Sequence, residues 1–277
     1  MGSAVPGSTP GLTGDEIRAE SELLDAAERE RRQVRQTTSV YPHTTIEEAY
    51  RVQAAWLDIR LGRGERVIGH KIGLTSRAMQ QAMNIDTPDS GFLTDAMAFS
   101  PGEPVAAADF CDLRLEVELA FVLGDDLHGT DLGIDDVLDA TDHVTAAVEL
   151  IASRTPRTDP ATGRTRTVVD TIADNAADAG VVTGGWPIGP RDADLRWVGA
   201  IAYRNGVVEE TGLAAGVLDH PANGIVWLAR RYAGQDRSLR AGQVILSGSF
   251  TRPMEVSPGD EFRFDFGLLG AFSIPIV

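Results

Sequence analysis

The stretch LEVELAFVL, residues 115–123, places two glutamates inside a run that otherwise has the composition of a protein core. On a β-strand the side chains alternate between two faces, so the apolar residues point one way while Glu116 and Glu118 point the other, about 7 Å apart at their Cα atoms. Two carboxylates on one apolar face repel each other and are costly to desolvate. The fold must therefore either expose that face to water or hold a cation between the carboxylates.

A third acidic residue repeats this pattern. TAAVELIAS, residues 145–153, places Glu149 between apolar neighbours in a second predicted strand. Oxygen ligands suit Mg²⁺ or Mn²⁺ better than zinc or copper, and Mg²⁺ keeps waters or substrate atoms in its remaining positions. One interpretation is a cation held by Glu116, Glu118 and Glu149. The alternative is that Glu116 and Glu118 lie on the solvated face of an antiparallel sheet.

Composition argues against several other classes of function. A formal net charge of −16, without a cluster of Lys and Arg among aromatic residues, argues against nucleic-acid binding. Cys111 is the single cysteine, so no intrachain disulfide or multi-thiolate zinc site can form, and the five histidines make no zinc-binding pair. No apolar run reaches 18 residues and the N-terminus lacks the regions of a signal peptide. We therefore expect no membrane association and a cytoplasmic location.

The N-terminal part of the chain has helical patterns. Residues 1–14 are mainly Gly, Ser, Pro and Thr and are predicted to be a disordered tail. Thr13 and Glu16 have capping-box spacing before a helix of roughly residues 15–37. A second helix follows and ends at Gly62.

The rest of the chain is rich in strand patterns. From residue 67, apolar runs bounded by Gly, Pro or Asp predominate, with fewer helical interruptions, one of them over residues 76–84. Asn205 and Gly206 lie between two such runs and predict a tight hairpin, because a primed turn needs positive φ at both central residues. The expected fold is α+β, with a helical segment over residues 15–66 and a β-rich catalytic domain over residues 67–277.

Two further residues are candidates for catalysis. Lys71, between glycines in the strand-like GHKIGLTS of residues 69–76, is either a donor to a developing oxyanion or an ordinary edge-strand lysine. DTPDSGFL, residues 86–93, is turn-like and would carry Asp89 into a site, although Asp after Pro is favoured in turns without any function. The sequence contains no phosphate loop, dinucleotide fingerprint or nucleophile elbow.

Taken together, these segments resemble a known family. Segments similar to those of the 2-oxohept-4-ene-1,7-dioate hydratases, in the hydratase/decarboxylase branch of the fumarylacetoacetate hydrolase superfamily, occur here in the same order: GHKIGLTSRAMQ, P-D-x-G-F-L, LEVELAFVL, AVELIASR, DTIADNAADAG, YRNGVVEETGLAAGVLDHPANG and ILSGSFTRP. The similarity runs from about residue 25 to the C-terminus. It implies a mixed β-roll fold, a divalent metal, usually Mg²⁺ with Mn²⁺ as the alternative, a homo-oligomer, and a role in bacterial degradation of aromatic compounds after ring cleavage.

The resemblance also implies roles for individual residues. The family's acidic metal ligands fall on Glu116, Glu118 and Glu149, its active-site lysine on Lys71 and an active-site aspartate on Asp89. The implied reaction converts a 2-hydroxy-2,4-dienoate to a 4-hydroxy-2-oxo acid. The metal would chelate the substrate's carboxylate and C2 oxygen, Lys71 would stabilise charge on that oxygen, and Asp89 would orient or deprotonate the water that adds at C4.

Substrate binding beyond the metal is assigned to four residues. Ser249 and Thr251 are candidates near the site, and Arg114 and Arg252 are candidates for binding a second, distal carboxylate in bidentate fashion, unless they are only structural. The sequence departs from close relatives next to the predicted aspartate, where Ser90 stands in place of a tyrosine. The shape of the pocket and the preference for a distal carboxylate therefore stay open.

Other functions also stay open at this stage. The first is a decarboxylase of the 4-oxalocrotonate type, which uses the same metal and enol chemistry on a 2-oxo-enedioate. A carbon–carbon bond hydrolase would need a His–Glu pair, for which no histidine here has an obvious claim. A non-catalytic partner subunit is a further alternative, since hydratases and decarboxylases of this branch associate, and association with a pathway decarboxylase or aldolase is open too.

Overall fold

The computed structural model describes residues 11–77, 80, 81, 85 and 87–277. Within these ranges the helices are α1 (Gly14–Glu30), α2 (Thr37–Val40), α3 (Ile46–Gly62), α5 (Ile134–Ala140), α6 (Val168–Ala173) and α7 (Ala222–Ala233). None of the helices described here is long and apolar enough to span a bilayer.

Two β-sheets make up the rest of the fold. The larger sheet has the spatial order β2 (Asp89–Thr94), β1 (Val67–Gly73), β9 (Val244–Leu246), β4 (Arg114–Leu123), β5 (Thr141–Ile151), β6 (Asp178–Ile188), β3 (Ala98–Phe99), with β10 (Met254–Glu255) paired to β4. The smaller sheet has the order β12 (Ala271–Pro275), β11 (Glu261–Asp265), β7 (Gly199–Arg204), β8 (Val207–Leu213). Both parallel and antiparallel pairs occur in the larger sheet, so the α+β class with a mixed sheet predicted from the sequence is confirmed.

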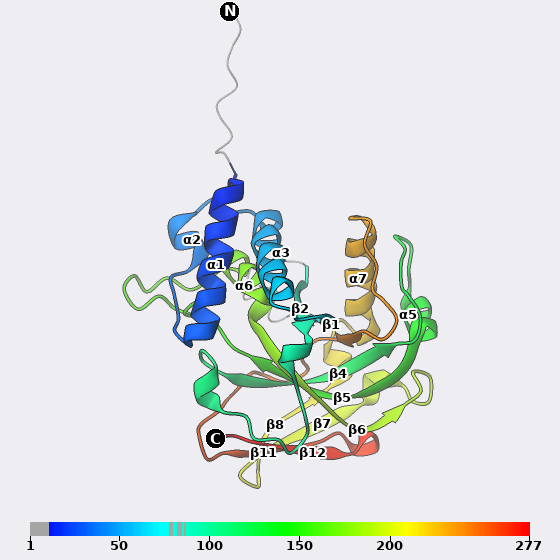
Figure 1. The fold of residues 1–277 in the computed structure, drawn as a ribbon. Helices are drawn as coiled ribbons and strands as arrows, with labels where there is room; N and C mark the ends of the chain where they lie inside the picture. Colours follow the sequence, from blue (N-terminus) through cyan, green and yellow to red (C-terminus); the bar gives the residue numbers. More distant parts are fainter. Residues whose placement is uncertain (1–10, 78–79, 82–84, 86) are drawn as a thin grey trace, which may run out of the picture.

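The elements form three layers (Figure 1), with helices α1, α3 and α7 on one face of the larger sheet and the smaller sheet on its other face. Strand β4 separates two hydrophobic cores. Leu115 and Val117 belong to a core with Phe264 of the smaller sheet, whereas Ala120 belongs to a core with Trp56 of α3. Because side chains alternate along a strand, the two glutamates of β4 share the helical side with Ala120.

The predicted tail of residues 1–14 includes positions that are folded. Leu12 is buried, and its N–H donates to Glu48 Oε1 at 2.7 Å. Thr13 and Glu16 form the predicted capping box at the start of α1. The first ten residues lie outside the described part of the chain.

The helix predicted over residues 15–37 is shorter than expected. Arg31 adopts a left-handed conformation with φ of 55°, and its N–H closes α1 on the carbonyls of the preceding turn. Gln36 is then held by side-chain hydrogen bonds of 3.1 Å to the carbonyl oxygens of Pro156 and Arg164. Contacts distant in sequence therefore interrupt a run that favours a helix locally.

Two local predictions had opposite outcomes. The hairpin is confirmed, with φ of 52° at Asn205 and 80° at Gly206 between β7 and β8. The turn predicted over residues 86–93 is wrong in its second half, because residues 89–94 form β2, which is buried throughout and pairs antiparallel with β1. The helix predicted near residues 76–84 falls partly on positions that the structure does not describe.

Candidate metal centre and active site

Three carboxylates meet on the helical face of the larger sheet. Glu116 of β4 lies opposite Glu149 of β5 in the strand register, and Glu118 lies two residues further along β4. One oxygen from each lies within 4.8 Å of the others. Glu118 is 1% exposed and Glu149 is 0% exposed, while Glu116 is partly buried. The solvated-face interpretation is therefore wrong for this strand.

The electrostatics of this cluster fit a bound cation. Both oxygens of Glu149 are buried and accept no hydrogen bond from the described residues. Burial, and then repulsion by Glu149, raises the pKa of Glu116 to about 7 and holds that of Glu118 well above its usual value. Glu118 Oε2 accepts a hydrogen bond of 2.8 Å from the Gly248 N–H. Three converging carboxylates that repel one another are the kind of oxygen-donor set that a hard divalent cation prefers. The residues present therefore fit a divalent metal ion.

Lys71 reaches this cluster from β1. Its side chain is nearly buried, and its Nζ lies 3.2 Å from Glu149 Oε1. Burial opposes the charge on Lys71, but Glu149, and after it Asp89, outweighs this effect and raises the lysine pKa above its usual value. Lys71 therefore stays protonated and can donate a hydrogen bond, but it cannot act as a base near neutral pH.

Asp89 lies beside Lys71 at the start of β2. It is 1% exposed, and its Oδ1 accepts no hydrogen bond within the described part of the chain. A Cβ at Gly73, the register partner of Asp89, would lie only 2.3 Å from this oxygen and 3.0 Å from Lys71 Nζ, so the glycine makes room for both groups. Burial raises the pKa of Asp89 to about 6 although Lys71 lowers it. A carboxylate with this pKa can take a proton from water near neutral pH.

These groups open into a pocket of about 500 Å³ that is lined by Lys71, Asp89 and Glu116. Ser249 and Thr251 also line it, from the segment after β9. Both are tied to the ligand strand, since Thr251 Oγ1 accepts the Val117 N–H and Ser249 Oγ donates to the Val117 carbonyl, each at 3.2 Å.

The two arginines predicted to bind substrate lie in different places. Arg252 lines the rim of the pocket, but its side chain is 85% exposed and pairs with Glu210. Arg114 is not among the described residues that line the pocket. Its Nη2 pairs with Glu255 Oε1 at 2.9 Å, outside the site.

The structure adds two arginines that the sequence prediction missed. Arg157 and Arg166 line the pocket from the loop between β5 and α6. The sequence signal was present, because RTPRTDPATGRTR, residues 154–166, gathers four arginines in a chain of net charge −16. A loop gives no periodicity from which the direction of those side chains can be predicted.

The corner before β6 also contributes to the pocket. Asn175, Ala176 and Ala177 all have φ between 50° and 63°, and the two alanines line the pocket. The Asn175 side chain holds β2, with its Oδ1 accepting the Phe92 N–H at 2.9 Å and its Nδ2 donating to the Phe92 carbonyl at 3.0 Å. Such strained backbone persists only where its surroundings fix it, so this segment forms a rigid corner.

Asp178, directly after this corner, is a further buried acid that the prediction missed. Its Oδ2 accepts no hydrogen bond from the described residues. Burial, and then the charge of Glu149, holds its pKa well above the usual value. When ionised, Asp178 favours the protonated form of Lys71.

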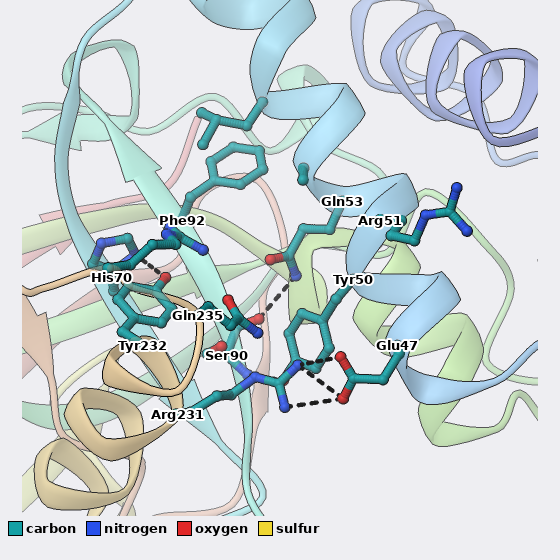
Figure 2. Close-up of a pocket in the computed structure, with 13 residues that line it drawn as sticks. Glu47, Tyr50, Arg51, Gln53, His70, Ser90, Phe92, Arg231, Tyr232 and Gln235 are labelled. Carbon is teal, nitrogen blue, oxygen red and sulfur yellow. Dashed lines mark hydrogen bonds and ion pairs between the residues drawn. The ribbon is translucent and has the colours of Figure 1, made fainter. Parts of the chain in front are cut away.

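A second pocket, of about 250 Å³, lies between α3 and α7 (Figure 2). There Tyr50 accepts a hydrogen bond of 3.1 Å from the Ser90 N–H, and Gln53 donates one of 2.8 Å to the Ser90 carbonyl. Arg231 stacks on the Tyr50 ring and pairs with Glu47. Because Ser90 follows Asp89 directly, these contacts hold the strand that carries the candidate catalytic aspartate.

Comparisons with known proteins place these observations in context. A family model described as fumarylacetoacetate (FAA) hydrolase C-terminal matches residues 66–277. The chain is 51% identical over 257 residues to a 2-oxo-hept-4-ene-1,7-dioate hydratase of Escherichia coli, covering 93% of this chain and 96% of that protein. It is 38% identical over 231 residues to a 2-keto-4-pentenoate hydratase of Paraburkholderia xenovorans, covering 83% and 84% of the two chains.

A solved structure is similar over nearly the whole chain. It is a 4-oxalocrotonate decarboxylase from Pseudomonas putida G7 complexed with magnesium and adipate, with a TM-score of 0.91 and 31% sequence identity. The match covers 96% of this chain and 99% of that one. These similarities confirm the resemblance drawn from the motifs and the fold that it implied.

Proposed function

The chain belongs to the fumarylacetoacetate hydrolase family, and from that premise we propose that it is a divalent-metal-dependent hydratase that adds water to a 2-hydroxy-2,4-dienoate. The proposed substrate is 2-oxohept-4-ene-1,7-dioate, the compound in the name of the E. coli hydratase that is 51% identical to this chain. The observation that carries the proposal is the cluster of Glu116, Glu118 and Glu149, whose carboxylates converge beside the pocket that Lys71 and Asp89 line. Both oxygens of Glu149 in this cluster are buried without a hydrogen bond from the described residues.

The proposed ion is Mg²⁺, with Mn²⁺ as the alternative, because the three ligands offer only carboxylate oxygens. Glu116, Glu118 and Glu149 would hold it. When bound, such an ion supplies Lewis-acid polarisation of the substrate's carboxylate and C2 oxygen.

The protein's own groups divide the remaining chemistry. Lys71 is protonated and buried, so it donates a hydrogen bond to the C2 oxygen and stabilises the negative charge that gathers there during the enol–keto change. The 2-hydroxyl group loses its proton and a proton is delivered to C5, which leaves a C2 carbonyl conjugated with a C3=C4 double bond. Asp89 takes a proton from water as the water oxygen bonds to C4, and the resulting enolate takes up a proton at C3. The product is a 4-hydroxy-2-oxo acid.

Ser249 and Thr251 are proposed to shape the pocket around the substrate, with Arg252 at its rim. We also propose that the enzyme is a homo-oligomer. Association with a pathway decarboxylase or aldolase is a separate proposal, testable by co-purification of the two proteins.

The test follows the ultraviolet absorbance of 2-hydroxyhepta-2,4-dienedioate with chelator-stripped protein and again after Mg²⁺ is restored, with product masses measured in parallel. The expected result is loss of the diene only with metal, together with a gain of the mass of one water. Absence of any metal-dependent change with any dienoate would contradict the proposed activity and favour a non-catalytic partner subunit.

Decarboxylation is the second candidate, favoured by the TM-score of 0.91 to the decarboxylase from P. putida G7. The same assay separates the two reactions when a hexenedioate substrate is used. Loss of the mass of CO₂ without a gain of water would replace the hydratase with a decarboxylase.

A further inference from the structure

A seven-carbon dioate carries a second carboxylate, and the site proposed above accounts only for the end that carries the 2-oxo group. We propose that Arg157 and Arg166, on the loop between β5 and α6, bind this distal carboxylate and make the enzyme selective for dicarboxylate substrates. This inference rests on the proposed function for the identity of the substrate. The contacts of the two arginines carry it independently of any relative.

One nitrogen of the Arg157 guanidinium group is hydrogen-bonded to the protein, and another has no acceptor among the described residues. Its Nε donates to Asp112 Oδ2 at 2.8 Å, which fixes the direction of the guanidinium group. Its Nη2 is buried and has no acceptor among the described residues. A buried guanidinium nitrogen without an acceptor is costly, unless a ligand supplies one. Arg157 also lines the pocket that contains Glu116.

Arg166 is held beside it. Its Nη1 donates to Ser153 Oγ, and its side chain is partly buried in the wall of the same pocket. Burial, and then the charge of Arg157, lowers the pKa of Arg166 to about 10. Arg166 has no carboxylate partner in the described chain, and it repels Arg157 at the wall of the pocket. Two neighbouring guanidinium groups in this situation favour binding of an anion.

The loop itself fixes the spacing of the two residues. The Arg166 N–H donates to the Arg157 carbonyl at 2.9 Å, so the residues face each other across the neck of a hairpin. Thr158 and Thr165 form an antiparallel bridge just beyond them. The pair therefore acts as a preorganised unit, and little side-chain freedom is lost when a carboxylate binds.

The two arginines predicted from the sequence are weaker candidates for this role. Arg252 is largely exposed and already paired with Glu210, and Arg114 pairs with Glu255 away from the pocket lining. Arg157 and Arg166 instead act electrostatically on groups of the site. Arg157 lowers the pKa of the proposed metal ligand Glu116 and Arg166 lowers that of Asp89, in each case against a larger effect of burial. All four side chains line the same pocket of about 500 Å³, so one substrate can reach both the proposed catalytic groups and the two arginines.

The test compares two substrates that differ in the distal carboxylate: 2-hydroxyhepta-2,4-dienedioate and 2-hydroxyhexa-2,4-dienoate. The variants are Arg157→Met and Arg166→Met, with Arg166→Lys as a second, milder change. Each Met variant is expected to raise KM for the dioate by about 10- to 100-fold, as loss of one hydrogen bond between charged groups predicts. The KM for the monoacid is expected to change less than about 3-fold, because the monoacid has no distal carboxylate that could bind the arginines.

Arg164→Met is the matched control. It lies on the same hairpin, and its Nη1 donates to the Thr38 carbonyl on the outside of the pocket. It removes the same charge, so it reports any general effect of charge on substrate attraction. We expect it to leave the preference for the dioate over the monoacid unchanged, and thermal unfolding of all variants checks that the fold is kept.

A binding measurement separates this inference from the proposed reaction. Calorimetric titration of the Mg²⁺-loaded protein with adipate and with hexanoate compares two six-carbon acids, neither of which can be hydrated. We expect adipate to bind more tightly and the preference to disappear in Arg157→Met and Arg166→Met. If the wild-type protein hydrates no dienoate but keeps this preference, the reaction is wrong and the carboxylate site stands.

Three outcomes would overturn the inference. Equal losses for dioate and monoacid would mean that the arginines serve the 2-oxo end or only the fold. A dioate-selective loss in Arg252→Met, absent from the other two variants, would place the distal carboxylate at the rim. Equal affinity of the wild-type protein for adipate and hexanoate would show that no distal site exists.

Discussion

Replacing Glu116 by glutamine is expected to stabilise the metal-free protein and to remove its response to metal. Burial and the charge of Glu149 raise the pKa of Glu116 from 4.5 to about 7. Because this pKa is higher in the folded protein than in the unfolded chain, the carboxylate lowers stability at every pH above about 4.5, and the full effect is present above about 7. A shift of this size corresponds to roughly 3 kcal/mol.

The assay is thermal unfolding of chelator-stripped protein at pH 8, with and without Mg²⁺. Glu116→Gln removes the charge but keeps the shape, so Tm without metal is expected to rise by roughly 6 °C for about 3 kcal/mol in a chain of this size. Mg²⁺ at 100 times its Kd would stabilise the wild-type protein by about 2.7 kcal/mol. The variant is expected to lose most of that gain.

Glu261→Gln is the matched control, since Glu261 lies exposed on strand β11 far from the cluster in sequence. It should change neither Tm nor the response to Mg²⁺. A lower Tm for metal-free Glu116→Gln would contradict this prediction, because it would mean that the carboxylate stabilises the fold through its own contacts. An equal response of both proteins to Mg²⁺ would show that the ion binds elsewhere.

Three further predictions concern single buried groups. Because burial raises the pKa of Asp89 in the free protein to about 6 and the base must be ionised, kcat/KM should fall as the pH drops below about 6. Asp89→Asn should lose both this pH dependence and on the order of 10²–10⁴-fold in rate; a variant that keeps the acidic limb would assign it to another group. Burial, and then Arg237, lowers the pKa of His70 to about 3. Its contribution to stability is therefore complete above about pH 6.5 and declines towards pH 3, by on the order of 2 kcal/mol at pH 5. The measurement is denaturant unfolding of wild type and His70→Gln at pH 5 and pH 8. The free energy of unfolding of the wild type relative to the variant should be lower at pH 5 than at pH 8 by this amount. The same relative free energy at both pH values would contradict the prediction. Arg154→Met should destabilise the fold by about 3–5 kcal/mol in urea unfolding, because it leaves buried Asp174 without its ion pair at 2.6 Å; a loss below about 1 kcal/mol would mean that Asp174 is protonated in the native protein.

The sequence was most informative where a local period carries the signal. Alternation along residues 115–123 was enough to place Glu116 and Glu118 on one face of a strand, and the register of β4 with β5 then brings Glu149 opposite Glu116. That register is a long-range property, so alternation alone left the choice between a metal site and a solvated face open. Burial of Glu118 and Glu149 in the folded chain decides it.

Prediction failed where distant segments override local preference. Residues 89–94 begin after a proline and have the composition of a turn, yet they form a buried strand because β1 lies on one side and Asn175 holds their backbone on the other. The directions of Arg157 and Arg166 likewise depend on contacts outside the loop: Arg157 is held by Asp112, which lies 45 residues away in sequence, and Arg166 by Ser153, which lies 13 residues away. A sequence pattern reveals the charge of such a loop but not the pocket that it faces.

The central claim is that Glu116, Glu118 and Glu149 together hold one divalent cation. The most direct test is an anomalous diffraction map from a crystal of the wild-type protein soaked with Mn²⁺. We expect a single strong peak bound by oxygens of these three glutamates, beside the pocket that Lys71 and Asp89 line. A peak only at another position, or none at a Mn²⁺ concentration that restores activity, would contradict it.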